Sequence, residues 1–571
     1  MRGAMDSPQT QLRAMRVVWL ARRTTGPKLV QALSQLVNDW QPDEIVDVVN
    51  FAMRQLPRDL RRSLYSAATA FVQGVSTREF AGEFRLSVID ETADAVSAKA
   101  LAKELAKTGE ISTPLRLLEA HIEDRSGALY KRLVEQNRLA LEGVSPSSCS
   151  REHLRAENRR ALYFVSQSCP HHSIGYAIRT QYLMKALQAA NWDMQVAARF
   201  GYPTDRNDYG SSELPPLDAV VDEVSYHFSP DPVGVRGKEA QAQHEVVVDA
   251  LLKQCDALRP SLIHSASNHV VGMAGAIAAK TFGIPSIYEV RGFWHMSRAA
   301  KEPGYQDSEH YRMIESLEVQ AALESDHVFV LTERMKQTLV DASVAPSSIT
   351  LLPNAVDSDR FVPQTRDAKL EKELGLKERL VIGFLGSMAA YEGLEDLLEA
   401  MYLLKAEVGD SVCVLLVGDG AAKEALVARA KALGLDEAVR FTGRVPHDDV
   451  SGYYSLMDVL CYPRRSLKVC EFVSPLKPFE AMAQEKAVVV SSVAALAEIV
   501  EHDVTGLVHT KGDVASLASC LRRLIADPGL RKSLGENAGA WVRKERTWQR
   551  NAETVSSVYE RLLAEVGSTR L

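Results

Sequence analysis

The chain has 571 residues, which is too long for a single hydrophobic core, so two or three domains are expected. Its apolar content of 46% and its charged content of 25% are those of an ordinary globular protein. A net charge of −7 argues against the broad basic surface that binds nucleic acid, so no nucleic-acid partner is expected.

Seven cysteines are scattered along the chain, an odd number without any C-x-x-C pair. This usage argues against a disulfide framework or a zinc site and favours reduced thiols in a reducing compartment. No run approaches the roughly 18 apolar residues of a membrane-spanning helix. No apolar signal segment stands near the N-terminus. The sequence therefore predicts a cytoplasmic protein.

Residues 1–150 are predicted to form an α-helical region that ends in a linker. The stretch from 11 to 142 is rich in Ala, Leu, Arg and Glu, with apolar residues three or four apart. Turn-forming residues gather in GVSPSSCS at 143–150. Between Gln11 and Val30, basic residues interleave with apolar ones, which suits either peripheral contact with the inner face of a membrane or the solvated face of a packed helix. A protein partner for these helices also stays open.

Short apolar runs alternate with helical patterns from Ala161 onward. The alternation predicts two tandem Rossmann-like domains, residues 151–365 and 366–548, each with about half a dozen parallel strands. A last helix within 549–571 is predicted to pack back on these domains. The runs interpreted as strands are LYFVSQS, MQVAARF, SLIHSAS, PSIYEV, HVFVLT, VIGFLGS, VCVLLVG, VRFTG, DVLCYP, AVVVSS and TGLVHT. Parallel sheets bind ligands at the carboxyl ends of their strands, so the two domains are expected to face a common cleft.

Two loops of the first domain carry candidate site residues. In SCPHHSIGYAIRT (168–180), Gly175 allows close backbone approach, and Ser173 and Tyr176 offer hydroxyl groups at the start of a helix. A plain strand–helix turn with incidental histidines explains this loop equally well. In YEVRGFWHMSR (288–298), acidic, basic and aromatic side chains crowd the carboxyl end of a buried strand, which favours a ligand there.

Glycine turns mark the second domain. Gly386 and Ser387 stand between a strand and a helix, where they can present N–H and hydroxyl groups to a phosphate. Gly418 belongs to a weaker, dinucleotide-like loop, for which an ordinary strand–helix turn is the better explanation. Arg444 and Val445 directly follow the strand VRFTG, in a position to contact a base or a ribose.

The segment Pro463–Val500 is the most informative part of the chain. A basic, Pro-rich loop leads into a helix, and Glu480 lies in the first turn of that helix. Cations and free backbone N–H groups at such a helix start suit a diphosphate, and the carboxylate can accept hydrogen bonds from sugar hydroxyls. The basic residues of the loop are Arg464, Arg465, Lys468 and Lys477. The segment indicates a nucleotide-sugar site.

A family resemblance rests on six segments that follow one another along the chain. They are SIGY (173–176), LLPNAVDSDRF (351–361), LGSMAAYEGL (385–394), VGDG (417–420), FTGRV (441–445) and PLKPFEAMA (475–483). Together they resemble the retaining glycosyltransferases of family four, whose GT-B fold consists of two Rossmann-like domains that face a cleft. PLKPFEAMA is the most specific segment. With YEVRGFW, it is similar to the bacterial subgroup that builds capsule, exopolysaccharide or O-antigen chains.

The resemblance implies a role for the residues of the last segment. Glu480 matches the glutamate that binds the donor ribose. The family's first glutamate falls at Phe472, and Glu471, one residue out of register, is the catalytic candidate in its place. The turn that touches the donor sugar and the diphosphate is matched by the backbone of Ser474, Pro475 and Leu476.

Other segments complete the implied site. Ser387 and Glu392 fall where many members carry a phosphate-binding Arg and Lys, and Arg291, a second catalytic candidate, falls where many carry a His near the reacting sugar. Because a leaving diphosphate develops charge that must be stabilised, its cations are then expected from Lys477, Arg464 or Arg465. The remaining implied donor contacts are Gly386, Gly418, Arg444 and Val445, and the implied acceptor contacts are Ser173, Gly175 and Tyr176.

The implied reaction is transfer of a sugar, with retention of configuration, from a nucleotide donor to a saccharide or lipid-linked saccharide acceptor in cell-surface polysaccharide synthesis. Positioning and electrostatic stabilisation would supply the catalysis. No cofactor is expected and, because no Asp-x-Asp lies in a suitable loop, no metal. Two other classes stay open. The residues at 291, 387, 392 and 472 favour a non-catalytic GT-B scaffold of a polysaccharide assembly complex, and a nucleotide-sugar epimerase or a phosphorylase is the third class.

Overall fold

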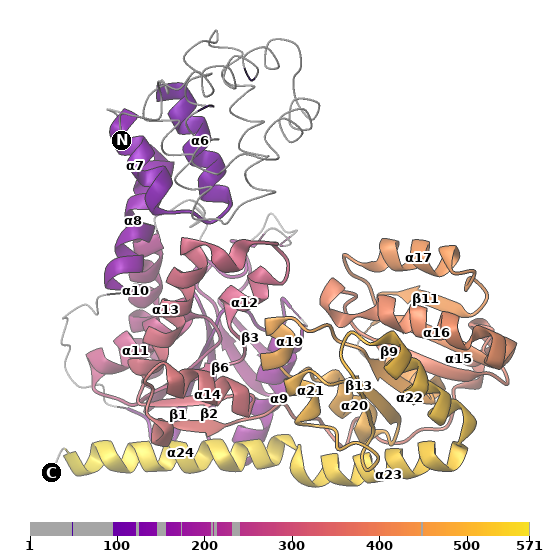
Figure 1. The fold of residues 1–571 in the computed structure, drawn as a ribbon. Helices are drawn as coiled ribbons and strands as arrows, with labels where there is room; N and C mark the ends of the chain where they lie inside the picture. The colour runs from indigo at the N-terminus through magenta and orange to yellow at the C-terminus, as the bar shows by residue number, and fades with distance from the viewer. Residues whose placement is uncertain are drawn as a thin grey trace. The chain divides into compact units, whose positions relative to one another are not determined.

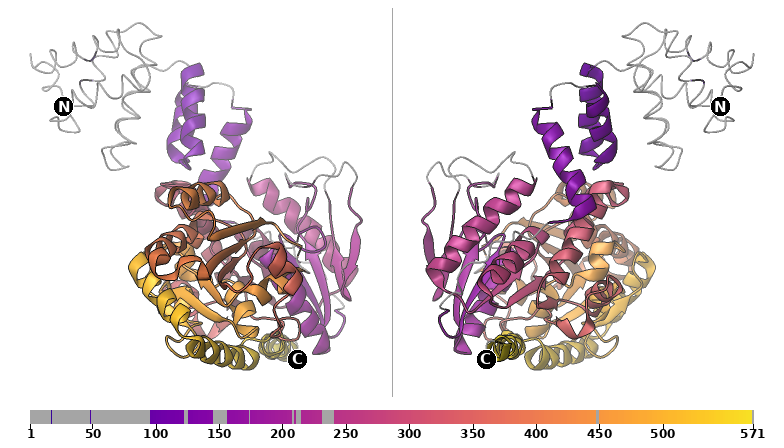
Figure 2. Two further views of the ribbon diagram at one scale, coloured as in Figure 1. Left: turned by 90° about the vertical axis from the view of Figure 1, so that its right-hand side faces the viewer. Right: turned by 90° about the vertical axis from the view of Figure 1, so that its left-hand side faces the viewer.

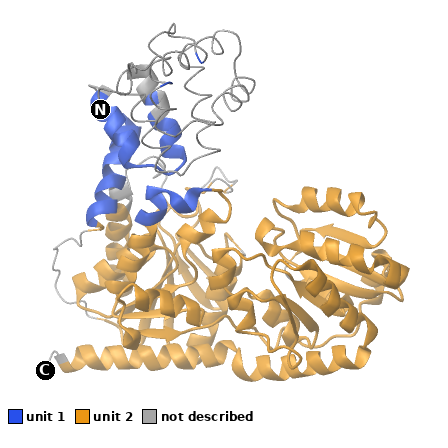
Figure 3. Cartoon of the chain, in the orientation of Figure 1, with its two compact units in different colours: residues 1–142, 304–313 blue, residues 143–303, 314–571 orange. Residues whose placement is uncertain are grey.

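The protein is represented by a computed structural model. It describes residues 17, 48, 95–121, 125–144, 156–172, 174–206, 209, 214–230, 240–446 and 449–569. The chain divides into two compact units, which Figure 3 colours separately. Unit 1 comprises residues 1–142 and 304–313, and unit 2 comprises residues 143–303 and 314–571.

Unit 1 is helical where it is described, as the sequence predicts for this region. Its helices are α6 (Ala95–Lys107), α7 (Ser112–His121) and α8 (Ala128–Glu142), followed much later by the short 3-10 helix η1 (Tyr305–Asp307). The distant segment 304–313 belongs here because the Glu309 carboxylate accepts hydrogen bonds from the N–H groups of Ile111 (2.5 Å) and Ser112 (2.6 Å), which caps the start of α7. Apart from Val17, the basic stretch predicted at 11–30 lies outside the described residues.

The first sheet of unit 2 has eight strands in the spatial order β3-β4-β2-β1-β5-β6-β7-β8. They are β1 (Arg160–Val165), β2 (Asp193–Ala198), β3 (Asp218–Val221), β4 (Val224–His227), β5 (Leu262–Ala266), β6 (Ser286–Val290), β7 (His327–Val330) and β8 (Ile349–Leu351). All neighbours are parallel except β3 and β4. The predicted strands of this half are confirmed. The β3–β4 hairpin and β8 were not predicted.

Helices cover both sides of this sheet. They are α9 (Gly175–Ala189), α10 (Ala240–Leu258), α11 (His269–Phe282), α12 (Trp294–Ala299), α13 (Glu309–Leu323) and α14 (Glu333–Asp341), with the 3-10 helix η2 (Pro346–Ser348). Small residues let α11 lie close to the sheet, where a Cβ on Gly275 would meet the Ser265 Oγ at 1.8 Å. Asn268 begins α11 by accepting a hydrogen bond from the Val271 N–H at 3.0 Å.

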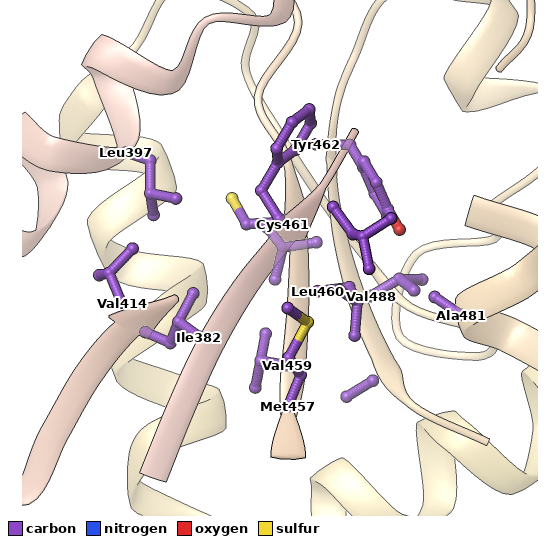
Figure 4. Packing of buried hydrophobic residues seen from close by; sticks show 14 of the residues in the cluster. Ile382, Leu397, Val414, Met457, Val459, Leu460, Cys461, Tyr462, Ala481 and Val488 are labelled. Carbon is purple, nitrogen blue, oxygen red and sulfur yellow. The ribbon is translucent and has the colours of Figure 1, made fainter. Parts of the chain in front are cut away.

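The second sheet has six parallel strands in the order β11-β10-β9-β12-β13-β14. They are β9 (Leu380–Leu385), β10 (Val412–Val417), β11 (Val439–Gly443), β12 (Val459–Tyr462), β13 (Ala487–Ser491) and β14 (Leu507–His509), and all six were predicted. Central strands with both faces covered read as continuous apolar runs. Figure 4 shows the result, with Ile382, Val414 and Leu460 packed beside Leu397 and Ala481 of the covering helices.

The helices of this second half pack around its sheet. They are α15 (Ala368–Glu373), α16 (Leu394–Val408), α17 (Lys423–Ala432), α18 (Val450–Leu456), α19 (Lys468–Phe472), α20 (Lys477–Ala483), α21 (Ala494–Ala497), α22 (Val514–Ala526) and α23 (Pro528–Glu545), with the 3-10 helices η3 (Ala390–Glu392) and η4 (Gly409–Ser411). We call residues 366–547 the second lobe. Residues 156–303, 314–355 and 548–569 form the first lobe.

The last helix, α24 (Trp548–Thr569), returns to the first lobe. Figure 1 shows it running lengthwise along that lobe, and the views of Figure 2 show it end-on. Val555 and Tyr559 are fully buried in the apolar cluster of the first sheet, and the Trp192 Nε1 donates to the Ser556 Oγ at 3.0 Å. None of the described helices combines the length and the apolar character needed to cross a membrane.

Candidate active site

The start of α20 places a carboxylate and an ammonium group next to the ends of the central strands of the second sheet. Glu480 is partly buried and accepts a hydrogen bond from the Tyr454 hydroxyl at 2.9 Å. Burial raises the pKa of Glu480, although Tyr454 and Lys477 oppose the shift. The hydroxyl of Tyr462, the last residue of β12, donates to the Lys477 carbonyl at 3.1 Å. These bonds attach the helix start to the sheet.

Three charged side chains form a cluster beside this helix, in which Arg464 and Glu392 are buried and Lys477 is partly buried. Arg464 makes a bidentate ion pair with Glu392, with N–O distances of 3.0 and 2.9 Å, and the Lys477 Nζ lies 3.6 Å from the same carboxylate. Burial alone would raise the pKa of Glu392, but Arg464 and Lys477 lower it to about 2. Glu392 is 3% exposed. The cluster holds one more positive than negative charge.

Of the two cations, Lys477 is the one that retains free hydrogen-bonding capacity. Arg464 gives its Nε and Nη2 to Glu392 and its Nη1 to the Val473 carbonyl at 3.0 Å. The Lys477 ammonium lies 4.6 Å from the centre of the Phe384 ring, above Gly386. A Cβ on Gly386 would stand 2.0 Å from the Lys477 Nζ, and the φ of 145° at Gly386 is one that residues with a side chain rarely adopt.

The carboxyl ends of β9 and β10 meet closely at their glycines. Gly386 follows β9, and Gly418 follows β10 with a φ of 132°. A Cβ on Gly418 would lie 2.0 Å from the Gly386 carbonyl oxygen, which explains why the position needs glycine. The Gly386 N–H donates to the Val417 carbonyl at 2.8 Å. Both predicted glycine turns therefore lie together beside Lys477.

The other predicted donor contacts lie around this centre. Ser387 and Arg444 are exposed, and Val445 is partly buried against the core of the second lobe. Arg465 is 40% exposed and pairs with Glu395 at 2.7 Å, outside the charged cluster.

The first lobe contacts the turn that leads into α20. A Cβ on Gly175 would lie 3.6 Å from Leu476 Cδ1, so the predicted acceptor loop and the predicted donor turn are neighbours. Ser474 is buried, and Pro475 is partly buried. The Tyr176 hydroxyl donates to the Ala266 carbonyl at 2.5 Å, which secures the start of α9. Ser173 lies outside the described residues.

Arg291 is part of a buried network in the first lobe. Its Nε donates to Glu289 at 2.9 Å, its Nη1 to the Thr180 Oγ1 at 2.8 Å and to the Tyr176 carbonyl, and its Nη2 to the Tyr163 hydroxyl. Burial alone would raise the pKa of Glu289, but Arg291 and Arg179 hold it well below its usual range. Arg291 is 7% exposed and its nitrogens are engaged within the protein. Its predicted contact with the reacting sugar stays a prediction.

Glu471 has its partners on the other side of the loop. Its carboxylate accepts hydrogen bonds from the Ala494 N–H at 2.8 Å and the Lys511 Nζ at 2.5 Å. Burial would raise the pKa of Glu471, but Lys511 and the Ala494 N–H lower it. It therefore supports the start of α21, and its predicted catalytic role also stays a prediction. Within the described residues, no group of three or more His, Cys, Asp and Glu side chains is placed to hold a metal ion.

Two site residues were not recognised from the sequence. One is Tyr454, whose hydroxyl donates to Glu480. The other is Asn354, which received no predicted role within the segment 351–361. Its side chain joins the two lobes, because its Nδ2 donates to the Ser474 carbonyl at 2.7 Å. No local pattern signals either contact, because the partners are 26 and 120 residues away in the sequence.

Two family models match this chain. Residues 366–541 match the model described as glycosyl transferases group 1. Residues 175–355 match the model described as a glycosyl transferase 4-like domain. The two matches fall on the second and the first lobe.

Individual relatives share less than 30% sequence identity with this chain. The 2-deoxystreptamine glucosyltransferase of Streptomyces kanamyceticus is 28% identical over 299 residues, 51% of this chain and 75% of the relative. The D-inositol 3-phosphate glycosyltransferase of Corynebacterium jeikeium strain K411 is 27% identical over 344 residues, 58% of this chain and 79% of the relative.

Solved structures share the fold. Sucrose-phosphate synthase from Thermosynechococcus elongatus matches with a TM-score of 0.58 and 21% identity, over 71% of this chain and 100% of that one. HepE from Anabaena, solved in complex with UDP, matches with a TM-score of 0.55 and 17% identity, over 70% of this chain and 100% of that one. The two Rossmann-like sheets thus form the predicted GT-B fold.

Proposed function

We propose that this chain, whose two lobes match two glycosyl transferase family models and form the GT-B fold, is a group 1 glycosyl transferase and a retaining enzyme of cell-surface polysaccharide synthesis. It transfers a sugar from a nucleotide-sugar donor to a saccharide or lipid-linked saccharide acceptor. The observation that carries the proposal is that Lys477 and Glu480 lie together in the first turn of α20, with the Lys477 ammonium next to Gly386, the glycine that follows β9. An ammonium suits a diphosphate and a carboxylate suits hydroxyl groups, so the pair fits the two polar parts of such a donor.

The second lobe binds the donor in this proposal. Glu480 accepts hydrogen bonds from the ribose hydroxyls, while Arg444 and Val445 contact the base. Lys477 stabilises the diphosphate, with the backbone N–H and the hydroxyl of Ser387 beside it, while Gly386 and Gly418 leave room for its close approach. Arg464 holds the Glu392 carboxylate in place, and that carboxylate in turn attracts Lys477.

The first lobe supplies the acceptor side, through Gly175, Tyr176 and Ser173. The acceptor hydroxyl attacks the anomeric carbon from the face that the diphosphate leaves. The new glycosidic bond forms as the bond to the phosphate oxygen breaks, and the hydroxyl proton passes to that oxygen. Arg291 contributes by holding the start of α9, and Glu471 by holding the start of α21. Lys477 stabilises the charge that develops on the diphosphate, so no metal or cofactor is needed.

We place the reaction in the cytoplasm, at the inner face of the membrane if the N-terminal helices bind lipid or a membrane-bound protein. The six cysteines among the described residues are free thiols, which supports a reducing compartment.

Thermal-shift screening against UDP-, GDP- and ADP-sugars tests the proposal first, since a ligand that binds the folded state raises the melting temperature. Proton NMR of the product with the active donor then reads the anomeric configuration, and EDTA should leave turnover intact. Absence of binding to every donor favours the non-catalytic scaffold. Release of an altered sugar from the donor alone, without an acceptor, indicates an epimerase.

A further inference from the structure

The loop Phe472–Leu476 belongs to the second lobe, but the first lobe contacts it at nearly every residue. The Thr332 Oγ1 donates to the Phe472 carbonyl at 2.8 Å. A Cβ on Gly292 would lie 3.2 Å from Val473, and Leu476 packs against the apolar cluster of the first sheet. The position of this loop is therefore set by the first lobe as much as by its own.

Asn354 makes the most specific of these contacts, because its amide is used on both sides. Its Nδ2 donates to the Ser474 carbonyl at 2.7 Å, and its Oδ1 accepts from the Arg179 Nη1 at 3.0 Å. Asn354 is 5% exposed, so neither bond is open to exchange with bulk water. The amide can satisfy both partners in one orientation only, with its NH₂ toward Ser474.

Arg179 is itself held rigidly. It donates to the Leu352 carbonyl at 2.8 Å and to the Pro353 carbonyl at 3.0 Å, and its Nε donates to Glu289 at 2.7 Å. Its side chain is 2% exposed and that of Glu289 is fully buried. A buried and fully paired charge of this kind cannot move without losing its partners. The hydrogen-bonded side chains Glu289, Arg179 and Asn354 are therefore held in fixed positions in the first lobe, and the last of them binds the Ser474 carbonyl.

We propose that Asn354 is a positioning residue that places the Ser474–Leu476 backbone for the donor sugar. The inference rests on the proposed function, which assigns this backbone to the sugar and diphosphate. Base and ribose bind Arg444, Val445 and Glu480, none of which touches Asn354. Asn354 therefore affects the recognition of the sugar part of the donor and leaves the recognition of the free nucleotide unchanged.

Asn354→Asp tests this step selectively. The carboxylate keeps the acceptor for Arg179 but removes the donor to Ser474 and sets an oxygen against its carbonyl. Asn551→Asp is the matched control: Asn551 is also 5% exposed, and its Nδ2 donates to the Pro353 carbonyl at 2.9 Å, one residue before Asn354. It removes the same kind of bond without touching the loop.

The full chain of each variant is titrated by calorimetry with UDP and UDP-glucose, and with GDP and GDP-mannose. For Asn354→Asp we expect a nucleotide Kd within about threefold of wild type and a nucleotide-sugar Kd weakened about tenfold or more, as fits one lost buried hydrogen bond. Asn551→Asp should keep the wild-type ratio of the two constants, even if its melting temperature falls.

The outcomes separate the two claims. If the wild type binds the donor and Asn354→Asp leaves the ratio of the nucleotide-sugar Kd to the nucleotide Kd unchanged, the positioning role alone is overturned. An equal change of this ratio in Asn551→Asp overturns it as well. A wild type that binds no nucleotide and no nucleotide sugar overturns the proposed function and this inference with it. If Asn354→Asp does not fold, Thr332→Val replaces it, because it removes the hydrogen bond to the Phe472 carbonyl. It should also weaken the nucleotide-sugar Kd and leave the nucleotide Kd nearly unchanged, and an unchanged ratio of the two would overturn the positioning role.

Discussion

At the scale of single residues, Glu480 combines a proposed ligand contact with a cost in stability. Its carboxylate is drawn into the protein beside Tyr454, and burial raises its pKa. A raised pKa in the folded state means that folding favours the protonated form. Stability therefore falls as the pH rises from the ordinary value of 4.5 through the raised pKa.

Glu480→Gln should accordingly separate binding from stability. The amide is always neutral, so at pH 7 the variant should resist urea at least as well as wild type. Donor affinity should fall by about tenfold or more, because a charged acceptor for ribose hydroxyls is lost. Calorimetric titration and urea unfolding measure the two effects. Glu437→Gln, whose parent side chain is 92% exposed in the same lobe, should change neither. Unchanged donor affinity in Glu480→Gln would contradict the ribose contact.

The stability that Glu392 contributes depends on pH in the opposite direction. Its folded pKa of about 2 lies below its ordinary value of 4.5, so the stability that it contributes is fully present above pH 4.5 and is lost as the pH falls toward 2. Glu392→Gln should therefore cost about 3 kcal/mol at pH 7, with a deficit that shrinks in acid. Urea unfolding at pH 7 and at pH 3 compares the two values.

An exposed ion pair provides the control for Glu392. Glu407 forms a similar bidentate pair with Arg522, at 2.7 Å for both bonds, but the side chains are each 49% exposed. Solvent screens such a pair, so Glu407→Gln should unfold close to wild type at both pH values. A deficit in Glu392→Gln that does not change with pH would show that the ion pair is not its source.

At the scale of elements, α24 closes the first lobe from the far end of the sequence. Tyr559 is fully buried, packs edge-on against Trp192 at 4.8 Å between ring centres, and shares a hydrogen bond of 2.7 Å between its hydroxyl and the His264 Nδ1. An amphipathic helix gains most of its stability from such packing rather than from propensity. The core of the first lobe is thus incomplete without α24.

Tyr559→Ala should cost about 3–5 kcal/mol, the usual penalty for removing a buried aromatic side chain. Thermal unfolding followed by circular dichroism measures it. Tyr402→Ala, on an exposed part of α16 where the parent side chain is 50% exposed, is the matched control and should melt near wild type. Equal losses in the two variants would contradict the packing role of α24.

At the scale of the whole molecule, the chain passes twice through unit 1. Segment 304–313 lies between α12 and the body of α13, yet it binds the early helices through Glu309. A truncation that starts after residue 142 therefore removes the partners of this segment. The proposed donor site lies entirely in unit 2.

Deletion of residues 1–142 should leave the donor Kd unchanged while exposing segment 304–313 to protease. Limited trypsin digestion followed by mass spectrometry should find new cleavage at Lys301 or Arg312, which flank or lie in the segment. The full chain under the same conditions is the control. Loss of donor binding in the truncated protein, with its melting transition intact, would show that unit 1 takes part in the site.

The sequence by itself determined the elements of the second lobe. Buried strands read as apolar runs such as VCVLLV and AVVVS, and they end in glycines or polar loops, so both the sheet and the carboxyl-end positions of Gly386 and Lys477 follow from local pattern. The β3–β4 hairpin was missed because Asp222 and Glu223 take its turn, with φ of 46° and 69°, in place of the usual Asn-Gly signal.

Only the tertiary structure decided which charges are available. Arg464 and Lys477 look alike in the sequence, but Glu392, 72 residues before Arg464, engages one fully and leaves the other above Gly386. In the same way, Glu289 and the Tyr176 carbonyl enclose Arg291. The physical reason is that hydrophobic periodicity is a property of neighbouring residues, whereas the pairing of a buried charge depends on side chains that only folding brings together.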